Sequence, residues 1–185
     1  MPRAGLTPEV VVDEAARVCD DSGFERLTLA AVAQRFGVAV PSLYKHVAGL
    51  DALRREVALR GTRELGRALA AAAARGEGLA DLAHAYRDYA RSHPGRYEAS
   101  LREPDPDDAE AGALRQAALE AVLAVLSGYG LSGDDAIDAT RTLRAALHGF
   151  VQLEVVGGFG LPQDVDRSFD RLVEILDAAL RNWNP

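Results

Sequence analysis

The stretch LTLAAVAQRFGVAVPSLYKHV, residues 27–47, contains two short segments with apolar residues at helical spacing. Thr28 can accept a hydrogen bond from the free N–H groups at the start of the first segment, and Gly37 suits the left-handed conformation that often ends a helix. Pro41 then fits the first turn of a second helix, where its missing N–H costs little. The sequence therefore predicts two helices separated by a tight glycine turn.

The second of these helices is predicted to have an apolar back and a polar front. Leu43 and Val47 lie four residues apart and are expected to point inward. The residues expected to point mostly outward are polar, aromatic or cationic: Ser42, Tyr44, Lys45 and His46. A tight turn followed by such a helix is the arrangement that a helix-turn-helix needs in order to enter the major groove of DNA.

The rest of the chain also has helical patterns. Thr7 and Pro8 indicate the start of a first helix, and Gly61 and Gly66 indicate bending or a close helix crossing within a long one. Pro94-Gly95 is expected to end a helix, with a short helix or turn after it. The other long helices are predicted at about residues 51–75, 79–93, 109–128, 132–156 and 164–182. No convincing strand is found, so the predicted fold class is all-α with about nine helices.

The composition excludes several classes of protein. The hydrophobic fraction is 48%, and its many alanines favour helix over sheet. The single cysteine, Cys19, excludes an internal disulfide and a multi-cysteine zinc site, and it is expected to be a small buried residue. The four histidines form no metal or catalytic motif, so we expect no metal, no cofactor and no enzyme activity. No apolar run is long enough to span a membrane, and a cytoplasmic protein is expected.

The net charge of −7 is unevenly distributed. Residues 1–60 contain 8 Lys or Arg and 8 Asp or Glu, whereas residues 61–185 contain 13 and 20. The segment with the helix-turn-helix pattern is therefore neutral, which predicts a modest affinity for phosphates in each subunit. The candidate cations near this segment are Arg3, Arg26, Arg54 and Arg55.

The N-terminal pattern resembles the DNA-binding helix-turn-helix of the TetR family of bacterial transcription regulators. The residues that carry the resemblance are Leu27-Thr28, Val32-Ala33, the corner Phe36-Gly37-Val38, and Leu43-Tyr44 with His46. The resemblance covers about the first 60 residues closely, and the remaining helices by size and order. It implies a helix-turn-helix DNA-binding domain at residues 1–52 and a ligand-binding and dimerisation domain at residues 53–185.

In the family, this helix docks in the major groove, and dimers bind palindromic DNA. Hydroxyl groups would bind phosphates, and apolar groups at the helix tip would contact thymine methyls. Three positions depart from the common pattern, namely Ala30, Ala39 and Leu50. Without Arg, Asn or Gln at the tip, little direct reading of base edges is expected. The residues that the resemblance assigns to DNA binding are Thr28, Val40, Pro41, Ser42, Tyr44, Lys45 and His46.

The family uses its second domain for dimerisation. Small residues in the helix at 132–156 would let another helix approach, and the last helix has a broad apolar stripe. Two such pairs can form a four-helix bundle about a two-fold axis, although both helices could also be core helices of a monomer. The candidate interface residues are Ala145, Gly149, Gln152, Leu172, Ile175, Leu176 and Ala179.

The same domain holds a small effector in the family. Aromatic residues with a few polar groups are typical of ligand sites, although a tyrosine stripe at helical spacing is more often part of a core. The stretch from His148-Gly149 also resembles a C-terminal domain type named for a Trp-His-Gly motif, with Leu147 at the tryptophan position. The candidate ligand-binding residues are Tyr86, Tyr89, His93, Tyr97, Leu101, Leu119, Val122, Leu126, Arg144, Leu147, His148, Val151 and Phe159.

The sequence therefore predicts a TetR-like transcription regulator with repression as the family default. It would bind a palindromic operator as a homodimer, and a small hydrophobic effector would release it by changing the setting of the helix at 51–75. The alternative is a helical small-molecule-binding or interaction protein whose DNA-reading segment has little or no affinity. Salt-dependent binding to promoter DNA would distinguish the two.

Overall fold

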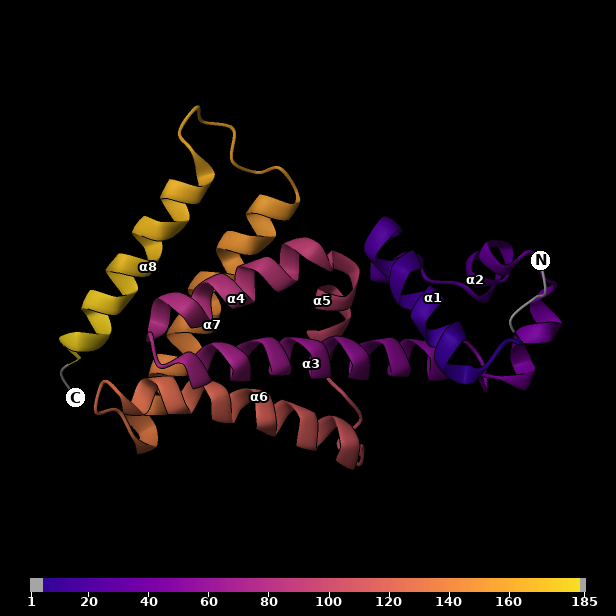
Figure 1. Ribbon diagram of the computed structural model, residues 1–185, viewed down its shortest axis with the longest axis horizontal. Coiled ribbons are helices and arrows are strands. Elements are labelled where there is room, and N and C mark those ends of the chain that lie inside the picture. The colour runs from indigo at the N-terminus through magenta and orange to yellow at the C-terminus, as the bar shows by residue number, and fades with distance from the viewer. Residues whose placement is uncertain (1–4, 184–185) are drawn as a thin grey trace. The chain divides into compact units, whose positions relative to one another are not determined.

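The computed structural model describes residues 5–183, and within this range the fold is all-α, as predicted (Figure 1). None of the helices in this range is both long and apolar enough to cross a membrane. The described residues form eight α-helices and two 3-10 helices, in the order α1 (Pro8–Ser22), η1 (Phe24–Arg26), α2 (Leu29–Phe36), η2 (Val40–Lys45), α3 (Leu50–Arg75), α4 (Leu79–Ser92), α5 (Pro94–Ser100), α6 (Ala109–Ser127), α7 (Gly133–Val155) and α8 (Val165–Arg181).

Local hydrogen bonds explain where the N-terminal helices begin and end. The Oγ1 of Thr7 accepts a bond of 3.3 Å from the N–H of Val10, and the Oγ1 of Thr28 accepts one of 3.1 Å from the N–H of Ala31. Gly37 ends α2 with a φ of 63°, a left-handed conformation that glycine adopts without steric cost. The predicted caps at Thr7 and Thr28 and the predicted turn at Gly37 are thereby confirmed.

Two segments differ in detail from what the sequence pattern predicts. The helix expected after Pro41 is a 3-10 helix, in which the N–H of Ser42 donates to the carbonyl of Ala39 at 2.9 Å. Ala39 has no side chain that could cap an α-helix there, and a short i to i+3 turn results. Pro94 and Gly95 end α4, as expected, but they also begin α5, because proline suits the first position of a helix.

The chain divides into two compact units that do not follow a single cut in the sequence. The first unit comprises residues 5–64 and 93–114 of the described chain, and the second comprises residues 65–92 and 115–183. Helices α3 and α6 therefore each contribute residues to both units. The functional division predicted at residues 52 and 53 stays a prediction, because it concerns DNA and ligand binding.

In the first unit, α5 packs closely against α1. Gly95 is buried, and a Cβ at this position would overlap the carbonyl group of Cys19 and lie 2.6 Å from the nitrogen of Asp20. Likewise, a Cβ at Gly61 in α3 would overlap the carbonyl oxygen of Arg96. The close crossing predicted at Gly61 is therefore present, and α5 fits between α1 and α3 only because both contact positions lack a side chain.

The core of the first unit consists of apolar residues from α1, η1, α2, η2, α3 and α5 and from two connecting loops. Cys19 is fully buried there, and burial raises the pKa of its thiol to about 12, so it behaves as the small buried residue that the sequence predicts. The buried members of this core are Val11, Ala15, Val18, Cys19, Phe24, Leu27, Leu29, Val32, Ala33, Leu43, Val47, Leu53, Val57 and Ala99.

In the second unit, α4 packs against both α7 and α8 (Figure 1). Phe169 of α8 is fully buried, and its ring meets those of His84 and Phe150 edge to face, with centroids 5.3 and 5.1 Å apart. Tyr129 donates a hydrogen bond to Asp177 and so ties the end of α6 to α8. Helices α4, α7 and α8 therefore pack together, and the Tyr129–Asp177 bond connects α8 to the segment that follows α6.

We expect that Gly95→Ala destabilises the protein, by about 1–3 kcal/mol as for other overpacked sites. The added methyl group would force α5 away from the backbone of α1. The measurement is the free energy of unfolding from urea titrations. Gly112→Ala, in α6 of the same unit, is the matched control, because its Cβ would meet nothing within 4 Å. This control should be neutral or stabilising; equal losses in both variants would contradict the packing argument.

Candidate nucleic-acid interface

Residues 40–46, called the recognition segment below, present polar groups at the surface and apolar groups to the core. Leu43 is fully buried and Val47 is 8% exposed, so both face inward as predicted. The Tyr44 side chain is 59% exposed, Lys45 is exposed, and Ser42 and His46 are half-buried. Of the other residues assigned to DNA, Thr28 and Pro41 are exposed, and Val40 is half-buried.

Most arginines in the first unit are already paired with carboxylates. Arg55, expected as a helper for phosphate binding, donates two hydrogen bonds to Asp108 at 2.6 and 2.8 Å. These bonds are the main reason that the pKa of Asp108 lies below its usual value. Arg54 instead donates to the carbonyl of Glu25 at 3.3 Å. Arg3 lies outside the described residues, whereas Arg26 and Lys45 are exposed and form no ion pair within the described range.

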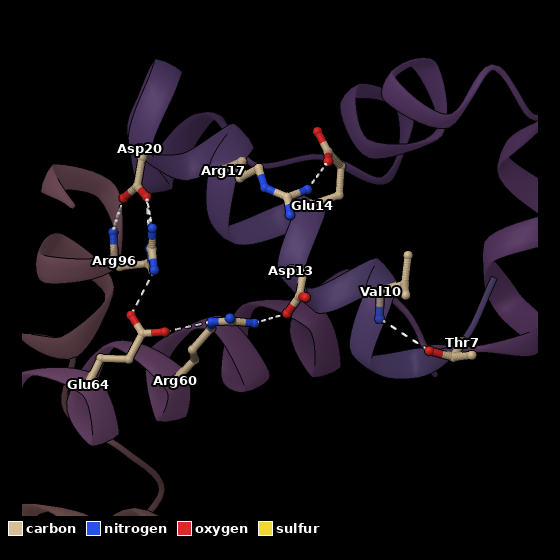
Figure 2. A network of polar contacts seen from close by, with 9 residues as sticks. All are labelled: Thr7, Val10, Asp13, Glu14, Arg17, Asp20, Arg60, Glu64 and Arg96. Atoms are coloured by element: carbon tan, nitrogen blue, oxygen red, sulfur yellow. Dashed lines mark hydrogen bonds and ion pairs between the residues drawn. The ribbon is translucent and has the colours of Figure 1, made fainter. Parts of the chain in front are cut away.

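A chain of ion pairs fixes α5 to the helices on either side of it. Figure 2 shows Arg96 of α5 between two carboxylates, Asp20 of α1 at 2.7 Å and Glu64 of α3 at 2.8 Å. Glu64 also accepts from Arg60 at 2.8 Å, and Arg60 reaches Asp13 on α1. Helix α5 is therefore held against α1 and α3 by ion pairs as well as by close backbone contact.

The pKa of Glu64 reflects opposing effects. Partial burial raises it, but the hydrogen bonds and charges of Arg60 and Arg96 together outweigh burial and leave it below its ordinary value. Glu64 is therefore ionised at neutral pH, and both guanidinium groups depend on it for their second carboxylate contact.

The residues predicted to bind an effector are distributed over both units. Three of them, His93, Tyr97 and Leu101, belong to the first unit, and the other ten belong to the second. Leu119 and Arg144 are exposed to solvent. The half-buried residues are His93, Leu101, Val122, His148 and Phe159. The buried ones are Tyr86, Tyr89, Tyr97, Leu126, Leu147 and Val151. Burial, with a contribution from the charge of Arg144, lowers the pKa of His148. The role of this set in binding stays a prediction.

The residues predicted for dimerisation lie along α7 and α8. Ile175 is 57% exposed, and Ala145 and Ala179 are exposed. Gly149, Gln152 and Leu172 are half-buried, whereas Leu176 is buried within its own unit. Most of the predicted interface is therefore accessible to another molecule.

Arg87 of α4 is a structural residue that the sequence pattern does not reveal. It is 3% exposed and donates to Glu154 of α7 at 2.8 and 2.6 Å and to Asp166 of α8 at 2.6 Å. Its guanidinium carbon lies 4.6 Å from the centre of the Phe169 ring. Its partners are 67 and 79 residues away in the sequence, so no local spacing could identify them.

These features define a helix-turn-helix DNA-binding regulator: a glycine turn, a recognition segment packed on the core, and an all-α fold. Residues 11–57 match the family described as "Bacterial regulatory proteins, tetR family", and residues 79–176 match "Tetracyclin repressor-like, C-terminal domain". The chain belongs to the TetR family of bacterial transcription regulators. Proteins of this family are DNA-binding regulators and not enzymes.

Two relatives support this assignment over most of the chain. The HTH-type transcriptional regulator Rv0681 of Mycobacterium tuberculosis is 42% identical, over 83% of this chain and 72% of the relative. The HTH-type transcriptional regulator YobS of Bacillus subtilis is 38% identical, over 89% of this chain and 87% of the relative. The solved structure of the Streptomyces coelicolor TetR family protein ActR in complex with (S)-DNPA has the same fold, with 20% identity, a TM-score of 0.64, and coverage of 96% and 98% of the two chains.

We expect that acidification removes the stabilisation provided by Glu64. Because its pKa is lowered in the folded state, the unfolded chain binds a proton more readily, and stability should fall as the pH drops below the ordinary value of 4.5. Glu64→Gln should therefore cost about 1–2 kcal/mol at pH 7 and show a shallower loss between about pH 5 and pH 3. Urea titrations at several pH values measure both effects.

The control for this prediction is Glu174→Gln on α8. Glu174 is 63% exposed and pairs with Arg171 one turn away, so its replacement should change stability little at either pH. An acid profile of Glu64→Gln that is parallel to that of the unmodified protein would exclude Glu64 as a source of the pH dependence.

Proposed function

We propose that this regulator is a repressor that binds a palindromic operator as a homodimer and is released by a small hydrophobic effector. The observation that supports DNA binding most directly is the recognition segment, where exposed Tyr44 and Lys45 are backed by buried Leu43 and Val47. Such a surface is anchored to the core and carries donors and a cation, as a helix that docks in the major groove requires. Since the operator is genomic DNA, the proposed place of action is the bacterial cytoplasm.

Each exposed group of the recognition segment has a proposed partner on DNA. The hydroxyls of Thr28, Ser42 and Tyr44 donate to phosphate oxygens, which fixes the position of the segment. Lys45 adds a positive charge near the phosphates, and His46 a further donor. In addition, Val40 and Pro41 contact thymine methyls. In the described part of the first unit, only Arg26 and Lys45 among the Lys and Arg residues have neither a carboxylate partner nor a backbone hydrogen bond, so binding should depend less on salt than in regulators with strongly basic heads.

The proposed dimer uses the exposed faces of α7 and α8. Leu172, Ile175 and Ala179 follow one stripe of α8, and the small residues Ala145 and Gly149 lie on α7. Small residues allow close approach of a second helix pair, and an exposed isoleucine gains free energy when it is covered. A palindrome has two-fold symmetry, so a two-fold dimer presents one recognition segment to each half-site.

The proposed effector binds in the C-terminal domain, residues 53–185. ActR shares this fold and was solved with (S)-DNPA bound, and the predicted lining residues here combine tyrosines with a few polar groups. An effector that binds one setting of α3 better than another would shift the population towards that setting. Because α3 contributes residues to both units, such a shift would change the recognition segment's fit to DNA.

The test of this function is selection of duplexes from random DNA by the purified full-length protein, followed by footprinting. We expect a palindrome with half-site centres one helical turn apart, roughly 34–36 Å, or a multiple of it. The affinity should fall as salt rises, with a logarithmic slope of about −0.9 for each phosphate contacted. Selection of no sequence, or of a site without two-fold symmetry, would refute the operator model.

The effector part of the proposal is tested on the selected duplex. A panel of hydrophobic small molecules is added to the complex, and at least one class should release the DNA and also raise the thermal stability of the free protein. A complex that no member of a broad panel dissociates would argue against release by a hydrophobic effector, while leaving operator binding intact.

Ile175→Glu should disrupt the proposed dimer, because a carboxylate would be buried against a second copy without a partner. We expect a monomer in sedimentation experiments at micromolar concentration and at least a tenfold loss of operator affinity, roughly 1.4 kcal/mol. Val10→Glu is the control: Val10 is 39% exposed but lies on α1 in the other unit. A dimeric Ile175→Glu variant would place the interface elsewhere.

A further inference from the structure

Lys45 is the only lysine in the chain, and it lies on the exposed front of the recognition segment. The other twenty basic residues are arginines, whose guanidinium groups do not form amides with common acyl donors. Lys45 ends η2, and the buried Leu43 two positions earlier fixes the segment to the core. The single side-chain amine of the protein is therefore held at the surface that the proposed function assigns to DNA.

We propose that Lys45 is a modification site at which an activated acyl donor, an acyl phosphate or an acyl thioester, switches off DNA binding. This inference rests on the proposed function, and it adds a form of regulation that is independent of an effector. Acylation converts the ammonium group into a neutral amide, so it removes the positive charge and two of the three donor hydrogens.

The charges of the first unit make the loss of this one cation consequential. Arg17, Arg35, Arg60, Arg63 and Arg102 form ion pairs with carboxylates, as Arg55 and Arg96 do. Of the remaining described cations in this unit, Arg54 is bonded to the carbonyl of Glu25. Among the described Lys and Arg residues of this unit, only Arg26 and Lys45 have neither a carboxylate partner nor a hydrogen bond to the backbone. Acylation thus removes the charge of one of these two cations.

The surroundings of Lys45 suit reaction with a small donor. The side chain is exposed, and Lys45 forms no ion pair with any described residue. The deprotonated Nζ attacks the acyl carbon and forms the C–N bond. The bond from that carbon to the phosphate oxygen or thioester sulfur breaks, and the leaving group takes the electron pair. One proton passes from nitrogen to solvent, and no oxidation or reduction occurs.

The experiment uses the full-length protein and the duplex selected above. The protein is incubated with acetyl phosphate and, in a second arm, with acetyl coenzyme A, and peptide mapping locates the acetyl group. We expect modification at Lys45, and protection of Lys45 when the duplex is bound. Acetylated protein should bind the duplex at least roughly tenfold more weakly, with a salt slope reduced by about 1 per subunit.

Two variants separate the loss of charge from other effects. Lys45→Arg keeps the charge, so it should bind DNA and be insensitive to acetyl phosphate. Lys45→Gln should bind as weakly as the acetylated protein, and circular dichroism should show that both variants are folded.

Three results would overturn the inference: unchanged affinity after modification of Lys45, equal inhibition of Lys45→Arg, or no acetylation of Lys45 by either donor. If the unmodified protein selects no DNA, the proposed function itself fails. Strong binding that acetylation leaves unchanged rejects only this inference.

Discussion

The contact between Gly95 and the backbone of Cys19 determines how the first unit, which contains the recognition segment, is assembled. Since neither Gly95 nor Gly61 has a side chain, α5 can lie directly against α1 and against α3. This close approach brings Arg96 within reach of carboxylates on both neighbours. Close packing and ion pairing therefore act at one place, and α1, which covers the helix-turn-helix core, has a fixed position within its unit.

The second unit is held by a different kind of constraint. Arg87 is almost completely removed from water, which is costly for a charge unless partners replace the lost hydration. Two carboxylates from α7 and α8 and the ring of Phe169 supply that replacement. Removing any one of them would leave a buried charge with too few partners. The cluster thereby restricts how α4, α7 and α8 can move relative to one another, and these helices carry most of the residues proposed for dimerisation.

The sequence alone predicts those features whose causes are local. Thr7, Thr28 and Gly37 act on residues within one helical turn, so their capping and turn roles can be recognised from neighbouring residues. Pro94 and Gly95 are ambiguous because the same residues can end one helix and begin the next. The partners of Arg87 and Arg96, and the engagement of Arg55 by Asp108, depend on contacts between residues at least 32 positions apart. Such contacts follow from the packing of whole helices, and no spacing rule contains them.

The insertion of residues 93–114 into the first unit has a consequence for protein engineering. Residues 93–114 follow α4 and include the first turns of α6, so the first unit is not a continuous piece of chain. A hybrid regulator made by exchanging only the N-terminal fifty or sixty residues would keep α5 from one parent and α1 from the other. The glycine contact and the Asp20–Arg96 pair would then have to match across parents. Both stretches should therefore be exchanged together, because together they make up the first unit.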